Sequence, residues 1–188
     1  MAKRSLPFVG LIASSLLLTA CAGTNTQSGS DMAATEMSLN NQDLYEVHDE
    51  GRIYLFDDRA TYEDFLAIGE TSYRKVRIGE GPKGETLVFG LTNEDKKKTS
   101  GIASIDMFDG DLNGAEDFYG EMRMEGRIYV FQSLEEMNNA RLVGEVPLRY
   151  TDIAAGPNGE TVVYALNGEN KKKKPVELMA KFKEANKM

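Results

Sequence analysis

Gly-Arg-Ile-Tyr at residues 51–54 returns as Gly-Arg-Ile-Tyr at residues 126–129. Gly-Pro-x-Gly-Glu-Thr at residues 81–86 returns with the same offset of 75, at residues 156–161. The 49 consecutive positions from Glu50 onward share 21 identities with their counterparts, without a gap. Chance does not produce such agreement, so the chain carries two copies of one module.

The strands expected in each copy are short and rich in β-branched and aromatic residues. They occupy residues 44–47, 52–56 and 86–91 in the first copy and residues 118–122, 127–131 and 161–166 in the second. A further strand is expected before the Gly-Pro-x-Gly segment. This segment predicts a turn, because its proline presets one backbone dihedral and its second glycine accepts a positive one.

The helix of each copy, between the second strand and the third, is bounded by capping signals. Residues 133–136, Ser-Leu-Glu-Glu, form a capping box, in which serine and glutamate satisfy each other's backbone amides. Asp58 or Thr61 caps the helix of the first copy. Gly69 and Gly144 stand where the helices end and a left-handed residue is needed.

The fold class expected is α+β, with two tandem ββαββ repeats packed as a pseudo-twofold unit. One copy of about 55 ordered residues buries only a marginal core, which favours packing of the two copies on each other. Apolar residues at helical spacing near the C-terminus predict a helix that docks on the second copy. They are Val176, Leu178, Met179 and Phe182. The expected segments are a signal peptide at 1–20, a tether at 21–42, repeats at 43–98 and 117–174, a connector at 99–116 and the C-terminal helix at 175–188.

The N-terminus has the layout of an export signal. Lys3 and Arg4 precede an apolar run at residues 6–18, which is too short to span a bilayer comfortably. The run ends in Leu-Thr-Ala-Cys at residues 18–21, which resembles the lipobox of bacterial lipoproteins. That resemblance implies cleavage before Cys21, acylation of this cysteine with chains such as palmitate, and anchoring in a membrane. An ordinary secretory signal with an incidental cysteine is the alternative.

The same resemblance implies where the protein resides. Ala22 follows the cysteine, where an aspartate would signal retention at the inner membrane, so the periplasmic face of the outer membrane is expected. Two or three acyl chains anchor durably, because each buried methylene contributes about 0.8 kcal/mol. Residues 22–42 are small and polar, which is typical of a flexible tether with a span on the order of 25 Å.

Composition excludes several classes of function. The net charge of −8 would become −10 on removal of residues 1–20, which argues against nucleic acid and against electrostatic adhesion to anionic lipid. Cys21 is the only cysteine, so its acylation leaves no thiol for a disulfide, a zinc site or a nucleophile. His48 is the only histidine, and its acidic neighbours indicate a solvated position. We expect no catalytic residues and no enzymatic activity, because no nucleophile, carboxylate pair or phosphate loop is singled out.

The strand Gly-Arg-Ile-Tyr-Leu-Phe at residues 51–56, followed by Thr-Tyr-Glu-Asp-Phe at residues 61–65, resembles YHS-type modules. Those modules carry a Gly-Lys-x-Tyr-Tyr-Phe strand before a short helix and often hold metal through cysteines. This chain has no cysteine at those positions, so the resemblance implies a similar shape and no metal function.

Asp-Gly-Asp-Leu-Asn-Gly at residues 109–114 resembles the first half of an EF-hand-type calcium loop. Oxygen ligands at alternate positions followed by glycine suit a calcium shell. The ligands would be Asp109, Asp111, Asn113 and Glu116, with Asp117 as an alternative to the last. Gly120 occupies the twelfth position, where a bidentate glutamate belongs. Two interpretations stay open, a weak structural calcium site between the copies and a hydrophilic loop without metal.

Several polar residues are kept in both copies. They are Arg52 and Arg127, Glu70 and Glu145, Arg74 and Arg149, and Glu85 and Glu160. They indicate either a repeated binding surface or cross-strand pairs that fix register and cover sheet edges. Lysine runs at residues 96–98 and 171–174 are likewise duplicated, and indicate either contacts with lipid phosphate or an acidic partner, or solvated loops.

The function expected from these features is that of a non-catalytic accessory or adaptor module for another envelope protein. A lipid anchor, a tether and sheet edges able to accept a partner strand fit this role. The alternative is a lipoprotein that binds a small molecule or ion and assists its uptake. Its ligand would lie between the copies, in a groove lined by Tyr54, Phe56, Tyr129 and Phe131, although these aromatics are equally typical of a core.

Overall fold

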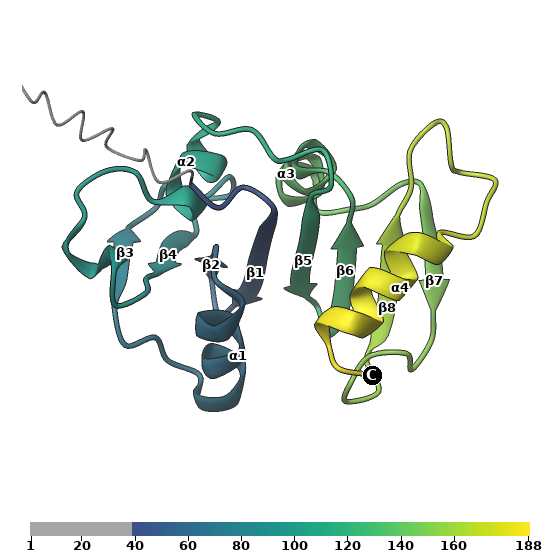
Figure 1. The fold of residues 1–188 in the computed structure, drawn as a ribbon, viewed down its shortest axis with the longest axis horizontal. Coiled ribbons are helices and arrows are strands. Elements are labelled where there is room, and N and C mark those ends of the chain that lie inside the picture. Colours follow the sequence, from purple (N-terminus) through teal and green to yellow (C-terminus); the bar gives the residue numbers. More distant parts are fainter. Residues whose placement is uncertain (1–38) are drawn as a thin grey trace, which may run out of the picture. The chain divides into compact units, whose positions relative to one another are not determined.

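A computed structural model describes residues 39–188, which form a mixed structure of strands and helices. This part of the chain holds four α-helices, one short 3-10 helix (Asp95–Lys97) and a single eight-stranded sheet (Figure 1). The strands are β1 (Asp43–Asp49), β2 (Arg52–Phe56), β3 (Arg74–Arg77), β4 (Thr86–Gly90), β5 (Tyr119–Met124), β6 (Arg127–Phe131), β7 (Arg149–Asp152) and β8 (Thr161–Ala165). The helices are α1 (Arg59–Ile68), α2 (Ala103–Asp109), α3 (Leu134–Val143) and α4 (Val176–Ala185).

The strand order in the sheet is β3-β4-β2-β1-β5-β6-β8-β7. β1 and β5 pair in parallel at the centre, with Tyr45 opposite Glu121, and so join the two halves of the sequence. The pairs β1–β2, β3–β4, β5–β6 and β7–β8 are antiparallel, whereas β2–β4 and β6–β8 are parallel. β3 and β7 are therefore the two edge strands.

The hairpins β1–β2 and β5–β6 turn through the same Glu-Gly dipeptide. Glu50 and Gly51 have φ angles of 45° and 75°, and Glu125 and Gly126 have angles of 53° and 72°. Two successive positive φ values are the geometry of a type I′ turn, whose twist matches that of the strands it joins. The strands predicted at residues 52–56 and 127–131 are present with those bounds as β2 and β6.

The helices begin and end near the predicted capping residues. Asp58 is the N-cap of α1, and its carboxylate accepts a hydrogen bond of 2.7 Å from the amide of Thr61. The Ser133 hydroxyl accepts one of 3.1 Å from the amide of Glu136 at the start of α3. Gly69 and Gly144 adopt the left-handed conformation that ends the two helices.

The sheet has a hydrophobic core on each face. One core receives side chains from α2 and α3, such as Met107 and Met137, together with Leu44 of β1. The other receives side chains from α1 and α4, such as Phe65 and Phe182, together with Tyr45 of β1. Figure 1 shows α4 crossing the strands of the second half. Successive residues of a strand point to opposite faces, so β1 contributes to both cores.

Two segments differ from the sequence-based expectation. The predicted connector at residues 99–116 contains α2, whose seven residues are too few for their apolar spacing to stand out. Residues 39–42, assigned to the tether, are hydrogen-bonded to the folded part: the carbonyls of Asn41 and Gln42 accept from the amides of Ala115 and Tyr119.

The signal peptide at 1–20, the acylated Cys21 and the tether as far as residue 38 lie outside the described residues. Within residues 39–188, no helix is long and apolar enough to cross a membrane.

Candidate functional site

Two hollows lie on the sheet, one in each half of the described chain. The first hollow has a volume of about 370 Å³ and is lined by β2, β3, β4 and the loop after α1. The second hollow has a volume of about 550 Å³ and is lined by β6, β7, β8 and the loop after α3. Each of the nine residues that line the first hollow has its counterpart, 75 positions later, in the lining of the second.

Each hollow contains two arginines, all four of which the sequence singles out. They are Arg52 and Arg74 in the first hollow, and Arg127 and Arg149 in the second. The guanidinium of Arg74 donates to the carbonyl of Thr71 at 3.3 Å, and that of Arg149 donates to the carbonyl of Val146 at 2.8 Å. The edge-strand arginine is thus held by the loop after the helix in both halves.

The second arginine of each hollow is more loosely held. Arg52 lies on the exposed end of β2 and donates only a long hydrogen bond of 3.4 Å to the Tyr54 hydroxyl. Arg127 is exposed at the start of β6, and within residues 39–188 no hydrogen bond or ion pair involves its side chain. Both guanidinium groups therefore remain available to an anionic partner.

An exposed isoleucine completes each hollow. Ile78 is 84% exposed and Ile153 is 81% exposed, although both are large apolar side chains. Ile68 and Val143, which end the helices α1 and α3, are a second exposed apolar pair at the same offset. Single exposed apolar residues are normal on a protein surface, so what distinguishes these positions is that each recurs at the same offset in the other half.

The kept polar residues divide into two groups. Glu85 and Glu160 have a structural role, since their carboxylates accept hydrogen bonds from the amides of Lys83 and Asn158 within the Gly-Pro-x-Gly turns. The other pairs line the two hollows. Within the first hollow Arg74 also pairs with Glu70 at 3.2 Å, and both side chains are largely exposed.

The aromatic residues expected to line a groove between the copies are separated. Phe56 and Phe131 are fully buried, on opposite faces of the sheet. Tyr54 and Tyr129 line the first and the second hollow respectively. The interpretation of these four residues as core, rather than as one groove, is correct for the two phenylalanines and for Tyr129, while Tyr54 is partly buried against a core.

The predicted calcium ligands are dispersed. Asp109 is the last residue of α2, and its carboxylate receives two hydrogen bonds from Arg77, at 2.7 and 2.8 Å. The backbone carbonyl of Asn113 accepts a hydrogen bond from the side-chain amide of Asn41. Glu116 lines a third hollow, beside α3 and α4. Among residues 39–188, no group of three or more His, Cys, Asp or Glu residues is placed to hold a metal ion. Calcium binding by Asp109, Asp111, Asn113 and Glu116 stays a prediction.

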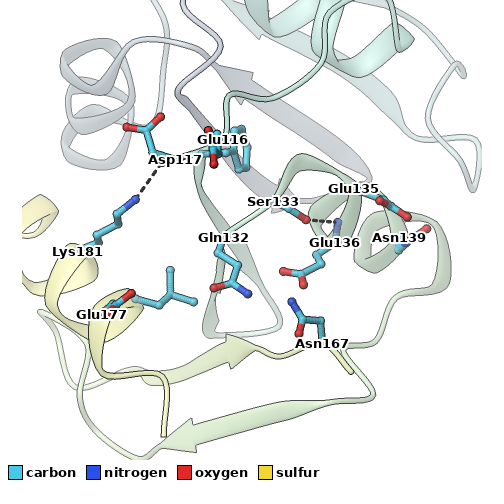
Figure 2. A pocket seen from close by; sticks show the side chains of 12 residues that line it. Glu116, Asp117, Gln132, Ser133, Glu135, Glu136, Asn139, Asn167, Glu177 and Lys181 are labelled. Carbon is cyan, nitrogen blue, oxygen red and sulfur yellow. Dashed lines mark hydrogen bonds between the residues drawn. The ribbon is translucent and has the colours of Figure 1, made fainter. Parts of the chain in front are cut away.

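A third hollow, of about 590 Å³, is strongly acidic (Figure 2). It lies between α3, α4 and the segment before β5, and Glu116, Asp117, Glu135, Glu136 and Glu177 line it. Its only lysine, Lys181, donates a hydrogen bond of 2.9 Å to the carbonyl of Asp117. Burial raises the pKa of Glu136, whose Oε2 has no hydrogen-bond partner within the described part of the chain. We call this the acidic hollow.

The lysine runs contribute local contacts. Lys96 lies over the ring of Tyr73, and Lys98 pairs with Asp95 at 2.6 Å. Lys174 lies over the ring of Tyr150. Each run follows the last strand of its half. Its aromatic contact places the first run beside the edge strand β3 and the second beside the edge strand β7.

Two fully buried glutamates were missed by the sequence analysis. Glu46 on β1 accepts hydrogen bonds of 2.8 and 2.6 Å from Arg141 on α3, and lies 2.5 Å from the Nε2 atom of His48. Burial alone would raise the pKa of Glu46, but the charge of Arg141 and the hydrogen bonds from His48 and Arg141 lower it below its usual value. His48 is thus bound to a buried carboxylate with 18% of its side chain exposed, and is not simply solvated.

Glu121 on β5 is the second buried glutamate. It accepts hydrogen bonds of 2.6 Å from Tyr62 on α1 and 2.9 Å from Tyr119, and one of 3.1 Å from Asn186 after α4. Arg59 of α1 also donates to it, at 3.4 Å. Glu121 follows Glu46 by the same offset of 75, so extending the alignment four residues before Glu50 would have found the pair.

Comparison of the chain with protein-family models found no match. Comparisons with curated proteins and with solved structures also found none.

Proposed function

We propose that this chain is a bacterial lipoprotein, anchored by acyl chains on Cys21 to the periplasmic face of the outer membrane. Its folded part acts as a non-catalytic accessory module that binds another envelope protein. The support for the anchor is the Leu-Thr-Ala-Cys sequence at residues 18–21 after an apolar run and two basic residues. Ala22 after the cysteine supports the outer membrane.

The folded part is, in this proposal, two tandem ββαββ repeats related by a pseudo-twofold axis. Every strand pairing of the first half has a counterpart in the second, as β1–β2 has in β5–β6. The central strands β1 and β5 run parallel, and α1 and α3 belong to cores on opposite faces. An axis along the strands, within the plane of the sheet, accounts for both facts. Helices α2 and α4 follow β4 and β8 and extend each repeat to ββαββα.

The observation that carries the binding role is the correspondence between the two hollows. Nine positions line both, and they include two arginines, a tyrosine, a glutamate and an exposed isoleucine. Exposed positions tolerate substitution, so an exposed isoleucine in both copies indicates a use beyond folding. Two equivalent surfaces on one anchored module suit an adaptor, because tethering raises the effective concentration for a partner at the same membrane.

The anchor is tested with Cys21→Ser. We expect this variant to be released from the membrane fraction or left unprocessed, and the wild-type chain to remain in the outer-membrane fraction. A correctly cleaved Cys21→Ser chain that stays in the membrane would contradict the anchor. Partner binding is tested separately, by cross-linking the lipidated chain in intact envelopes and identifying captured proteins by mass spectrometry.

Binding of a small ligand or ion is the second candidate, because a hollow of about 420 Å³ lies between α2 and α3, where the two halves of the sequence meet. Its volume falls in the usual range for small-molecule sites, roughly 300 to 1,000 Å³. Met107, Leu112 and Asn113 line it beside Leu134 and Asn138. A ligand bound only by the folded state raises its melting temperature, so thermal unfolding with and without calcium tests the ion first.

A further inference from the structure

We propose that the first and second hollows each bind an acidic side chain, flanked by an apolar one, from a segment of the partner protein. The inference rests on the proposed role as a protein-binding module and specifies its surface. The arginines would hold the carboxylate, and the exposed isoleucine would cover the neighbouring apolar side chain.

The anion that fits is a carboxylate. Arg74 already donates to a carboxylate, that of Glu70 at 3.2 Å, and Arg77 on the same strand donates two hydrogen bonds to Asp109. The pair of Arg74 with Glu70 is largely exposed, so a second carboxylate displaces it at little cost. A planar guanidinium binds a carboxylate through paired hydrogen bonds.

Charge distinguishes a carboxylate from a phosphate. The lining of the first hollow holds Arg52, Arg74 and one glutamate, Glu70, while Asp49 and Glu50 lie close enough to act on the charge of Arg52. The second hollow holds two arginines and two glutamates, Glu125 and Glu145, and so is neutral. These glutamates repel a singly charged carboxylate less than they repel a phosphate, which carries nearly two charges.

The overall charge favours a protein over a lipid surface. The chain has a net charge of −8, so an anionic membrane repels it as a whole. Within this acidic chain each hollow brings two arginines together beside a solvent-exposed isoleucine. A concave site of this kind can receive a single anchoring side chain of a partner.

To test this inference, peptides are selected from a random phage-displayed library, with the full chain in detergent as the target. The selected peptides are then synthesised and their dissociation constants measured by fluorescence anisotropy. We expect an aspartate or glutamate beside an apolar residue in the enriched sequences. The double variant Arg52→Gln and Arg127→Gln should weaken binding by about tenfold or more, as loss of a charged hydrogen bond does.

The matched control is the double variant Lys97→Gln and Lys172→Gln. Like the arginine variant, it removes two positive charges, but from exposed residues outside the hollows that are also 75 positions apart. Binding should therefore stay within about twofold of wild type. Ile78→Asn with Ile153→Asn should weaken binding without altering the preference for an acidic residue. Selection that enriches no peptides, or only peptides without acidic residues, would overturn the inference. So would equal binding by the arginine variant, or binding of inorganic phosphate in place of peptides.

The outcome separates this inference from the proposed function. If an envelope partner is captured equally well by the wild-type chain and the arginine variant, the hollows are not its site and the adaptor role stands. If peptides bind in the hollows but cross-linking in intact envelopes captures no partner, the surface chemistry stands and the adaptor role fails.

Discussion

Arg141 on α3 donates two hydrogen bonds, of 2.8 and 2.6 Å, to Glu46 on β1, and both side chains are buried. The two residues are 95 positions apart and belong to different halves of the sequence. Glu121 in the second half makes the reverse connection, because Tyr62 and Arg59 of the first half donate to it. Each half thus supplies a buried carboxylate whose helical partner comes from the other half.

The pair of Glu46 and Arg141 should matter strongly for stability. Arg141→Leu leaves a fully buried carboxylate without its cation, which typically costs about 3 to 5 kcal/mol in the free energy of unfolding. Equilibrium unfolding in urea measures this loss. The double variant Glu46→Leu with Arg141→Leu should recover much of it, since replacing both charges removes the unpaired group. A double variant less stable than Arg141→Leu alone would contradict this account.

The dependence of stability on pH should be traceable to single carboxylates. Burial raises the pKa of Glu160, but hydrogen bonds from its own amide and that of Asn158, together with Arg123, lower it to about 2. The group therefore contributes stability above its ordinary pKa of 4.5, and this contribution is lost as the pH falls from 4.5 towards 2.

Glu160→Gln should therefore flatten the fall in stability between pH 4.5 and 2. Urea unfolding midpoints at several pH values measure the slope. Glu46, whose pKa is also lowered, should act in the same direction, so Glu46→Gln is the second variant. A slope unchanged by Glu160→Gln would show that its contacts with Arg123 and the turn do not favour the charged form.

Helix α4 should be held chiefly by Phe182. This side chain is fully buried and meets Tyr164 edge-on, with ring centroids 6.0 Å apart. Phe182→Ala should cost about 3 to 5 kcal/mol in the free energy of unfolding. Val176 on the same helix is 64% exposed, so Val176→Ala is the matched control and should change stability by no more than about 0.5 kcal/mol. Equal effects of the two variants would contradict the observed packing of α4.

Separated halves should not fold. A piece covering residues 39–116 would expose the edge of β1 and leave Glu46 without Arg141, and the piece 117–188 would leave Glu121 without Tyr62. We expect neither piece to show a cooperative thermal transition by circular dichroism. A cooperative transition in either piece alone would contradict the reciprocal dependence of the halves.

Local features of the fold were predictable from the sequence because they depend on neighbouring residues. Residue types a few positions apart account for the N-caps at Asp58 and Ser133 and for the left-handed ends of the helices. The same holds for the type I′ turn at Glu50 and Gly51. The parallel pairing of β1 with β5 joins Tyr45 to Glu121, and no local pattern announces it. The helix α2 was missed for another reason, because its seven residues are too few for their apolar spacing to stand out.

The candidate site was partly predictable. The sequence singled out the four arginines of the hollows because duplication kept them, but the exposed isoleucines at residues 78 and 153 were passed over. Both isoleucines were visible in the alignment as identical residues. The exposure of these isoleucines was not visible, since isoleucine is among the residues most often buried.

In the function we propose, a lipid-anchored module binds an envelope protein through its two hollows. The most direct measurement compares cross-linked partners of the lipidated wild-type chain with those of the Arg52→Gln, Arg127→Gln variant in intact envelopes, quantified by mass spectrometry. We expect one near-stoichiometric partner with the wild-type chain and its loss with the arginine variant, while Lys97→Gln with Lys172→Gln retains it. Absence of any partner above background with the wild-type chain would contradict the claim.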